Sequence, residues 1–271
     1  METGKANNIQ ASTFNIDHSE QYHLSVQIGL KHLSYCIINN STNNVEYFNN
    51  FIINDDFINI INKEEILKLN FAYSSVSFTN FPCILVPNEL FKEENAKKIL
   101  ELTSDIYDII KSDPIAEIDT HLVYTISNVI NDIVFTFFPN AKQKAQQSIL
   151  IEQFGKFDNN KDNAYLYISE NILNITAFKN GKLLFNNAFS FDTKEDILYF
   201  TLFAFEHLNL DTETVNIKLY GKIIKGDENH QLLYEYIRNI EFGSRPNHLN
   251  FSSEFNELQE HQFYGLFSQS I

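Results

Sequence analysis

Histidines are the residues of this sequence with the widest chemical range, because an imidazole can bind a metal ion or transfer a proton near neutral pH. The eight histidines are scattered along the chain, at His18, His23, His32, His121, His207, His230, His248 and His261. No two are four residues apart on a predicted helix, and none has a cysteine or carboxylate neighbour at the spacing of a metal site. The sequence therefore predicts no metal centre. We expect His23 and His121, on predicted strands, to have polar structural or surface roles.

Adjacent carboxylates could perform acid–base chemistry, which would require one of the pair to be buried with a raised pKa. The pairs are Asp55-Asp56, Glu64-Glu65, Glu93-Glu94 and Glu195-Asp196. Each lies at a predicted helix start or on a solvated face, where the helix dipole favours negative charge. The sequence has no Gly-x-Ser-x-Gly, Walker, His-Glu-x-x-His or kinase signature. It therefore predicts no catalytic residue.

The charge balance argues against anionic partners. Among 271 residues, 20 are Lys or Arg and 35 are Asp or Glu, which gives a formal net charge of −15. The longest basic cluster is Lys97-Lys98, whereas nucleic-acid binding relies on many basic side chains that neutralise phosphates. Unless the fold assembles a basic patch, we expect no direct binding to nucleic acid or anionic lipid. A protein is the expected partner.

Three features bear on where the protein works. The first 20 residues are polar and lack the basic and apolar regions of a signal peptide. No apolar run approaches the roughly 20 residues that span a bilayer. Cys36 and Cys83 lie in apolar, strand-like runs, which predicts buried free thiols and no disulfide scaffold. We expect a cytoplasmic protein without membrane insertion.

Any site must be positioned by the secondary structure around it. In each half of the chain the hydrophobic pattern predicts the same order of elements, which is strand, strand, strand, helix, strand, helix. Residues 1–20, rich in Asn, Ser, Thr and Gln, are predicted to be a disordered tail. In the first half the predicted segments are strands at 23–28, 33–39 and 45–53, a helix from Asp55 or Asp56 to about Leu69, a strand at 72–79, an apolar run at 83–86 and a helix from 87 to about 103. In the second half they are strands at 164–169, 172–178 and 183–189, a helix capped by Thr193 with Asp196, a strand at 215–220 and a helix at 231–240.

The two halves repeat with a constant offset of about 141 residues between their first strands. Between them the sequence predicts a strand at 118–126, helices at 128–138 and 147–154, and a polar linker at 155–163. A strand-like piece near 248–251 and an amphipathic C-terminal helix follow the second half. These patterns predict an α/β protein with a tail at 1–20, lobe I at 21–157 and lobe II at 158–271.

The repeated pattern resembles the actin-like ATPase fold, with ribonuclease H-like lobes, that sugar kinases, actin and chaperone ATPases share. The strand-helix-Pro139-helix join is similar to that of the pilus-assembly and cell-division branch. More closely, residues 20–271 resemble a domain-of-unknown-function family of Bacteroidetes with this predicted fold. The segments that carry this closer match are Leu24-Ser25-Val26-Gln27-Ile28, Phe138-Pro139-Asn140-Ala141, Glu195-Asp196-Ile197-Leu198-Tyr199-Phe200, Leu219-Tyr220-Gly221 and His261-Gln262-Phe263-Tyr264-Gly265-Leu266. The resemblance implies in each lobe a mixed sheet of three antiparallel strands plus further strands, flanked by helices.

The resemblance also implies where a nucleotide would bind. Actin-like ATPases hold Mg²⁺ and phosphates with an Asp-x-Gly hairpin in each lobe. The matching positions here are Gln27-Ile28-Gly29 and Ser169-Glu170-Asn171, and the nucleoside-binding glycines are reduced to Gly221-Lys222. An amide binds Mg²⁺ less well than a carboxylate, and only 8 residues of the chain are glycine. We expect this nucleotide site to be degenerate.

The sequence therefore favours a non-catalytic actin-like protein that acts as a protein-binding or scaffolding module without a cofactor. The alternative is an atypical ATP-binding protein, ATPase or small-molecule kinase that uses ATP and Mg²⁺ through Glu170, Asp192 or another displaced carboxylate. A module beside RNA-processing machinery that does not touch RNA is a third hypothesis. The aromatic runs at 78–81, 135–138 and 199–205 are expected in the core, with the inter-lobe groove or a docking face as the alternative.

Overall fold

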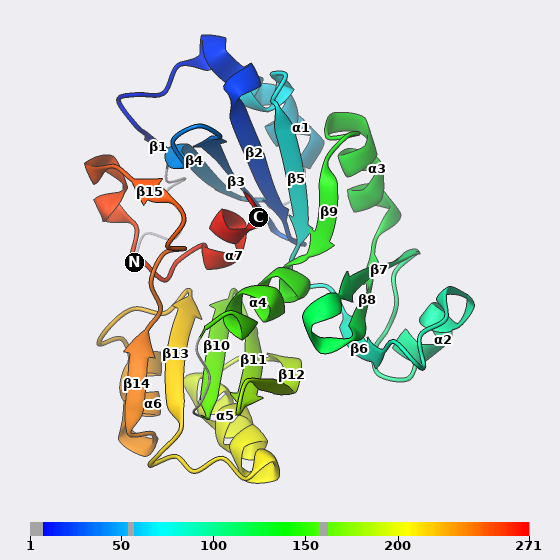
Figure 1. Ribbon diagram of the computed structural model, residues 1–271, viewed down its shortest axis with the longest axis vertical. Helices are drawn as coiled ribbons and strands as arrows, with labels where there is room; N and C mark the ends of the chain where they lie inside the picture. Colours follow the sequence, from blue (N-terminus) through cyan, green and yellow to red (C-terminus); the bar gives the residue numbers. More distant parts are fainter. Residues whose placement is uncertain (1–7, 54–56, 158–161, 271) are drawn as a thin grey trace.

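The computed structural model describes residues 8–53, 57–157 and 162–270. Two sheets lie one above the other along the long axis, and helix α4 (Gln146–Gly155) lies between them (Figure 1). We call the upper half lobe I and the lower half lobe II. The predicted α/β class is confirmed. The expected cap residues Asp55 and Asp56, and residues 158–161 of the expected linker, lie outside the described residues.

The main sheet of lobe I combines three antiparallel strands with two parallel ones. Its strands and the helices on it are β2 (Tyr22–Ile28), β3 (His32–Asn39), β4 (Asn44–Ile52), β5 (Tyr73–Phe78), β9 (Lys142–Ala145), α1 (Phe57–Lys63) and α3 (Asn128–Phe137). The order is β4-β3-β2-β5-β9, and β2 pairs antiparallel with β3 and parallel with β5. Strand β9, a polar run of four residues, was not predicted.

Lobe II repeats this topology. Its elements are β10 (Asn163–Ser169), β11 (Ile172–Lys179), β12 (Lys182–Ser190), β13 (Asn216–Gly221), β14 (Asn239–Phe242), α5 (Lys194–Leu208) and α6 (Glu228–Tyr236). The strand order β12-β11-β10-β13-β14 is that of lobe I, position by position. The first strands begin at Tyr22 and Asn163, which is the predicted offset. The helix predicted at 231–240 is divided between α6 and β14.

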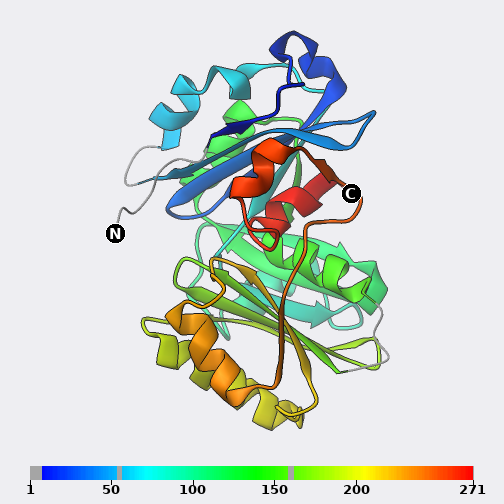
Figure 2. The same ribbon diagram turned by 90° about the vertical axis from the view of Figure 1, so that its left-hand side faces the viewer.

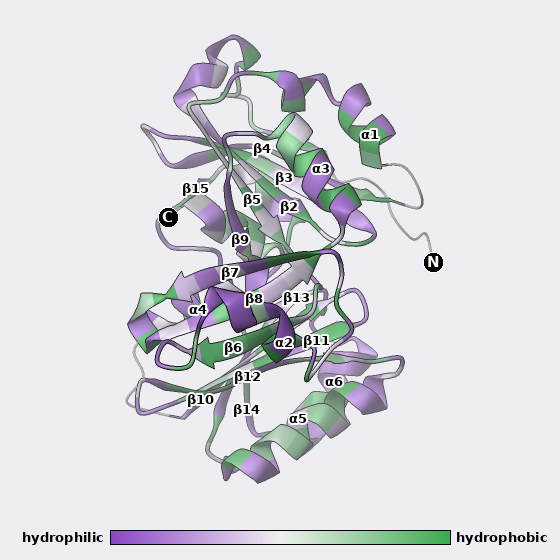
Figure 3. Ribbon diagram, turned by 90° about the vertical axis from the view of Figure 1, so that its right-hand side faces the viewer, coloured by the Kyte–Doolittle hydropathy of each residue, from purple (hydrophilic) through white to green (hydrophobic). Residues whose placement is uncertain are grey.

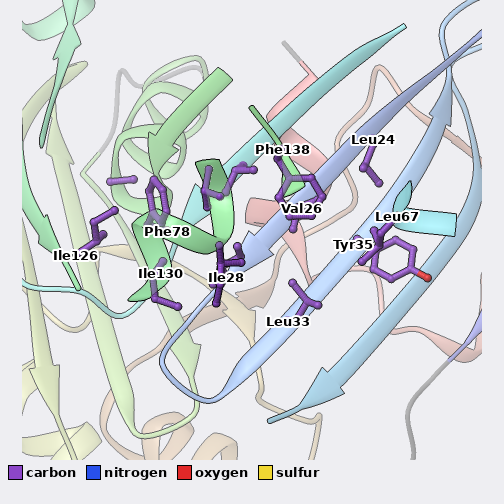
Figure 4. Close-up of a cluster of buried hydrophobic side chains, with 14 of the residues drawn as sticks. Leu24, Val26, Ile28, Leu33, Tyr35, Leu67, Phe78, Ile126, Ile130 and Phe138 are labelled. Atoms are coloured by element: carbon purple, nitrogen blue, oxygen red, sulfur yellow. The ribbon is translucent and has the colours of Figure 1, made fainter. Parts of the chain in front are cut away.

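The alternation of side chains explains how each sheet is covered. In lobe I, Leu24, Val26 and Ile28 of β2 pack with residues of α1 and α3 in one apolar core (Figure 4). In lobe II, Leu166 and Ile168 pack against α5 and α6, and the alternate residues Tyr165 and Tyr167 pack against α4. Successive side chains of a strand point to opposite faces, so this pattern fixes which face each helix covers.

Two local signals in lobe II have the predicted structure. Asn180 and Gly181, at the β11–β12 turn, have φ values of 50° and 74°, the left-handed region that this turn needs. The capping box of α5 is also present. Thr193 accepts a hydrogen bond from the Asp196 backbone N–H, and the Asp196 side chain accepts one from the Thr193 backbone.

A second, three-stranded sheet is inserted in lobe I between β5 and α3. It contains β6 (Cys83–Pro87), β7 (Ile109–Ile115) and β8 (Thr120–Ile126), in the order β6-β8-β7, with α2 (Ala96–Leu100) packed beside it. The helix predicted from 87 to about 103 is therefore limited to α2 and a preceding 3₁₀ turn at Glu93–Asn95. Strand β7 was not predicted.

The two ends of the described chain both belong to lobe I, which corrects two predictions. Strand β1 (Ile9–Gln10) pairs with β4, and a 3₁₀ helix follows at Ile16–Gln21, so residues 8–20 are not a disordered tail. Strand β15 (Asn250–Phe251) also pairs with β4. Helix α7 (Tyr264–Phe267) packs on the face of this sheet that is turned toward lobe II (Figure 2). The segment from β15 onward therefore completes lobe I, although the sequence placed it in lobe II, and Tyr264 of α7 also packs on Tyr220 of lobe II.

Further 3₁₀ helices connect these elements, at Glu65–Lys68, Ala116–Ile118, Ser253–Glu257 and Ser268–Ser270. Of the helices in the described residues, none combines the length and the apolar character that a bilayer span requires. Both cysteines are free thiols, with Cys36 buried and Cys83 partly buried. Burial raises the pKa of Cys83 to about 12, so this thiol stays protonated at neutral pH.

Candidate inter-lobe site

The turn between β2 and β3 meets the turn between β10 and β11, and one side chain from each lobe joins them. The Nδ1 atom of His32, at the start of β3, lies 2.8 Å from Oε1 of Glu170. Beside this contact, Nδ2 of Asn80 in lobe I donates a hydrogen bond to Oγ of Ser169 in lobe II, over 3.3 Å. We call the His32–Glu170 contact the inter-lobe clasp. The two hairpins that the sequence singled out are thus in direct contact.

Glu170 is held ionised in this contact. The hydrogen bond from His32 is the largest cause that lowers the pKa of the Glu170 carboxyl, and partial burial opposes it. The residue also has a left-handed backbone, with φ of 55°. Such a conformation is uncommon for a residue with a long side chain. Glu170 therefore occupies the turn position that a glycine would occupy with less strain.

Four of the six expected site residues line one small cavity next to the clasp. Gln27, Ser169, Gly221 and Lys222 lie around a volume of about 150 Å³. Glu170 lines a separate cavity of about 520 Å³, and Gly29 lines neither. The structure thus brings together the residues expected from both lobes, and it divides them between two cavities.

Gln27 is the position where the resemblance expects a metal-binding carboxylate. Its side chain is 4% exposed, and among the described residues its Nε2 has no hydrogen-bond partner. The neighbouring Oγ of Ser34 donates to Oδ1 of Asn50, over 2.7 Å. Neutral amides and hydroxyls therefore surround this part of the cavity. They offer little of the negative charge that a divalent cation requires.

The two glycines of the expected site are needed for different reasons. Gly221 has φ of 82°, and a Cβ there would lie 2.0 Å from the carbonyl oxygen of Ile168. The backbone N–H of Lys222 donates to that same oxygen, over 2.7 Å. A Cβ at Gly29 would instead lie 2.3 Å from the ring of His32. Gly221 allows two backbones to meet, whereas Gly29 makes room for the clasp.

These residues are a poor fit for Mg²⁺ with a nucleoside triphosphate. Among the described residues, no group of three His, Cys, Asp or Glu side chains could hold a metal ion. The cavity that four of these residues line, about 150 Å³, is smaller than the roughly 300–1,000 Å³ typical of small-molecule sites, whereas the cavity beside Glu170, about 520 Å³, lies within that range. The carboxylate nearest to the hairpin turns, Glu170, is already bonded to His32.

Sequence reasoning missed His32 as a site residue, although it had considered every histidine. His32 and Glu170 are 138 residues apart, and no local spacing relates them. The repeat itself was the available signal, because an offset of about 141 residues places the two hairpins at equivalent positions of the two lobes. His23 and His121, which the sequence predicts to have polar structural or surface roles, have structural contacts. Nε2 of His23 lies 2.9 Å from Oγ of Ser75, and His121 stacks on Phe91.

A buried carboxylate that the sequence analysis did not consider positions the inter-lobe helix. Asp113 of β7 accepts hydrogen bonds from the backbone N–H of Ala145 and from Oγ of Ser148, each over 2.7 Å. These donors lie at the start of α4, where backbone N–H groups need acceptors. Burial raises the pKa of Asp113, and these hydrogen bonds oppose that shift. Asp113 thus attaches the inserted sheet to α4.

Comparison with known proteins places the chain in a family. Residues 11–240 match the family model described as "Protein of unknown function (DUF3822)". The chain belongs to the DUF3822 family. A search of curated proteins finds no significant match to this DUF3822 chain.

Solved structures show which fold this DUF3822 chain has. A Bacteroides thetaiotaomicron protein of unknown function with an actin-like ATPase fold is similar, with a TM-score of 0.79 and 19% identity. The similarity covers 86% of this chain and 94% of that one. The PilM-PilN type IV pilus biogenesis complex is similar at a TM-score of 0.54 and 12% identity, over 90% of this chain and 95% of that one. The chain therefore has the actin-like ATPase fold, as its sequence predicts.

Proposed function

We propose that this chain is a non-catalytic actin-like protein that acts by binding another protein, as a scaffold or adaptor. The observation that carries the proposal is the inter-lobe clasp. The side chains of His32 and Glu170 are hydrogen-bonded to each other at the two turns where the actin-like fold would hold phosphates. A carboxylate that bonds a histidine across the lobes stabilises their closure and is not available to organise a metal ion.

The composition of the small cavity supports the same proposal. Gln27 contributes an amide and Ser169 a hydroxyl at the two positions where carboxylates would be needed. Binding of Mg²⁺ and a triphosphate would require the clasp to open, and the opened site would still lack the first carboxylate. We therefore expect this chain to work without a cofactor.

The type of partner follows from charge and from the fold. A net charge of −15 disfavours nucleic acids and anionic lipids, because both repel an acidic surface. One similar solved structure is itself a complex of pilus biogenesis proteins, PilM with PilN. These two observations support the proposal that this chain acts in an assembly, with a protein as its partner.

Two measurements test the non-catalytic part of the proposal. Fluorescent ATP is titrated into the protein with Mg²⁺, and phosphate release from ATP is followed in parallel. We expect no saturable binding below millimolar concentration and no turnover. Micromolar binding accompanied by phosphate release would contradict the proposal. His32→Ala, which opens the clasp without supplying a carboxylate at position 27, should give the same negative result.

One observation favours the alternative, an atypical ATP-binding protein, ATPase or kinase. The lowered pKa of Glu170 keeps a carboxylate charged beside the cavity of about 520 Å³, which is large enough for a small molecule. Asp192, the other carboxylate considered, lines neither inter-lobe cavity. If the alternative holds, wild-type turnover should disappear in Glu170→Gln while the far-UV spectrum stays unchanged. Full activity in that variant would remove Glu170 from the mechanism.

A further inference from the structure

Helix α5 carries a line of exposed side chains that the fold does not use. Glu195, Tyr199, Phe203 and His207 follow one another at intervals of four residues, so they form one stripe along the helix. Tyr199 is 60% exposed and Phe203 42% exposed. Their rings stack with centroids 5.9 Å apart, and the Phe203 ring lies 4.2 Å from the His207 ring. We call these four residues the α5 stripe.

The stripe is separate from the face that holds α5 on the sheet. Ile197, Thr201, Ala204 and Phe205 are buried against lobe II. The run 199–205 was predicted in the core, with the inter-lobe groove or a docking face as the alternative. In the structure Thr201, Ala204 and Phe205 are buried, whereas Tyr199 and Phe203 are exposed on the outer side of lobe II (Figure 3). Figure 3 shows α5 beside α6 on the outer side of lobe II, away from lobe I and the inter-lobe site.

The stripe rests on a second layer of rings, which holds it in place. The Phe200 ring stacks on Phe189 of β12 with centroids 4.7 Å apart, and Phe189 stacks in turn on Phe185. Tyr199 packs edge-on against Phe200, at 5.4 Å. A partner would therefore meet aromatic side chains that are already ordered, which lowers the entropy lost on binding.

Exposure alone does not single out the stripe. On the neighbouring helix α6, Tyr234 and Tyr236 are 62% and 53% exposed. Tyr234 stacks with His230, and the ring contacts continue from there away from α6, to Phe242 and the buried His261. Within the part of the chain that the structure describes, no ring contact joins Tyr234 to Tyr236. The α5 stripe differs because its three rings follow one another along a single helix, over about 12 Å from Tyr199 to His207 at a rise of about 1.5 Å per residue.

The charges around the stripe define the chemistry of its partner. Glu195 is at one end of the row and Glu206 is beside His207 at the other, and both are exposed. Among the described residues neither carboxylate forms an ion pair, and the adjacent Lys194 pairs instead with Glu228, over 3.1 Å. Aromatic ring faces attract cations, and Lys or Arg side chains would also neutralise these carboxylates.

We propose that the α5 stripe is the docking surface for a basic amphipathic helix of a partner protein, with its apolar face on Tyr199 and Phe203 and its Arg or Lys residues toward Glu195 and Glu206. The whole stripe, about 18 Å from Glu195 to His207, corresponds to roughly three turns of such a helix. This inference rests on the proposed function and names the surface and the charge of the partner.

A synthetic helix tests the proposal directly. The probe is a 15-residue peptide with Leu on one face and Arg on the flanking positions, and its counterpart has Glu in place of every Arg. Binding to the full chain is measured by isothermal titration at two salt concentrations. We expect the Arg peptide to bind, more weakly at high salt, and the Glu peptide to show at least tenfold lower affinity.

Two pairs of matched variants locate the binding. Tyr199→Ser with Phe203→Ser should weaken binding at least tenfold, whereas Tyr234→Ser with Tyr236→Ser, which removes two equally exposed rings from α6, should leave it within twofold. Glu195→Gln with Glu206→Gln should reduce both affinity and salt dependence. The control Glu235→Gln with Glu257→Gln changes the net charge equally and should have little effect. All these side chains are exposed, so we expect every variant to fold.

Three results would overturn the inference. They are equal binding of both peptides, equal loss in the α5 and α6 variants, and a dimer in sedimentation that Tyr199→Ser with Phe203→Ser dissolves. The last result would assign the stripe to a second copy of the chain. None of them bears on nucleotide turnover, which tests the proposed function separately.

Discussion

The hairpin turns of the two lobes occupy equivalent places in the same topology, yet they differ from the expected phosphate-binding turn in different ways. The turn of lobe I keeps its glycine, Gly29, but has Gln27 where a carboxylate is expected. The turn of lobe II has Ser169 where a carboxylate is expected and no glycine, and its carboxylate, Glu170, is one residue further on in a left-handed conformation. The two turns meet through these residues: Gly29 makes room for His32, and His32 bonds Glu170.

A phosphate site of the expected kind needs a glycine and a carboxylate at matching positions of the same turn, because backbone N–H groups and the metal act on the same ligand. Neither turn here has both, and the two turns are joined by an inter-lobe contact instead. This difference is what the proposed function predicts for turns that hold the lobes together. Four substitutions in or beside the two turns test whether the turns differ in this way.

The largest effect is expected at Gly221, beside the lobe II turn. In Gly221→Ala the new Cβ meets the Ile168 carbonyl oxygen at 2.0 Å with φ at 82°, so we expect a loss of about 3 kcal/mol or more of unfolding free energy. The matched control is Gly226→Ala, with φ of 86° and open space around the Cβ. It should lose only about 1 kcal/mol, from the backbone conformation alone. Equal losses in urea unfolding would mean that the close approach does not matter.

Restoring a carboxylate on the lobe I turn should destabilise the protein. In Gln27→Glu a charge enters a side-chain position that is 4% exposed, and we expect a loss of about 2–3 kcal/mol. Lys222, which lines the same cavity, keeps the loss below that of a fully unpaired charge. The loss should shrink toward pH 4, where the carboxyl can take up a proton. Recovery of the melting temperature by millimolar Mg²⁺ would show that this turn lacks only its carboxylate.

Gly29→Ala should act through the clasp. The new Cβ would displace the His32 ring, which can move because it is a side chain, and we expect a loss of about 1–2 kcal/mol. In a His32→Ala background the same substitution should cost little, since the ring is gone. A double-mutant cycle in chemical unfolding measures this coupling. If the losses of unfolding free energy in Gly29→Ala and His32→Ala simply add in the double variant, Gly29 does not act through the clasp.

The smallest effect is expected for Glu170→Gln, about 1 kcal/mol at neutral pH, because the contact between the lobes is partly exposed. The folded protein lowers the pKa of Glu170 below its ordinary value of 4.5, so the carboxylate binds a proton more weakly than in the unfolded chain. Its stabilisation is therefore present above pH 4.5 and is lost as the pH falls below that value.

The Glu170→Gln protein should lack the part of the pH dependence of stability that the Glu170 carboxylate contributes. Thermal unfolding of wild type and Glu170→Gln between pH 7 and pH 3 measures it, and the two stability curves should converge as the pH falls. Parallel curves over the whole range would show that the clasp contributes nothing to stability.

The repeat, the fold and the position of the site could be predicted from the sequence because their signals are local or periodic. Alternation in 22–28 and 163–169, the Asn180-Gly181 turn and the Thr193 cap all favour one structure over short distances. The elements that were missed lack such signals. Strand β9 is the polar run Lys142-Gln143-Lys144-Ala145, and β7 contains Asp113 and Pro114, which strands rarely contain.

The contents of the site were harder to predict. The substitution at Gln27 can be read directly, because it concerns one residue type at one position. The contact between His32 and Glu170 depends on how two lobes dock, and each residue alone looks like an ordinary surface residue. The C-terminal residues were misplaced for a similar reason, because an amphipathic helix shows that it packs but not against which lobe.

The pairing of β15 with β4 has a consequence for how the protein is made. On the ribosome, residues 163–242 are synthesised before Asn250, so lobe II can complete its sheet while lobe I still lacks a strand. Until Gln269 emerges, the hydroxyl of Ser77 and the carbonyl oxygen of Val26 also lack the amide that bonds them. We therefore expect lobe I, although it is translated first, to complete its sheet only after lobe II has formed its own.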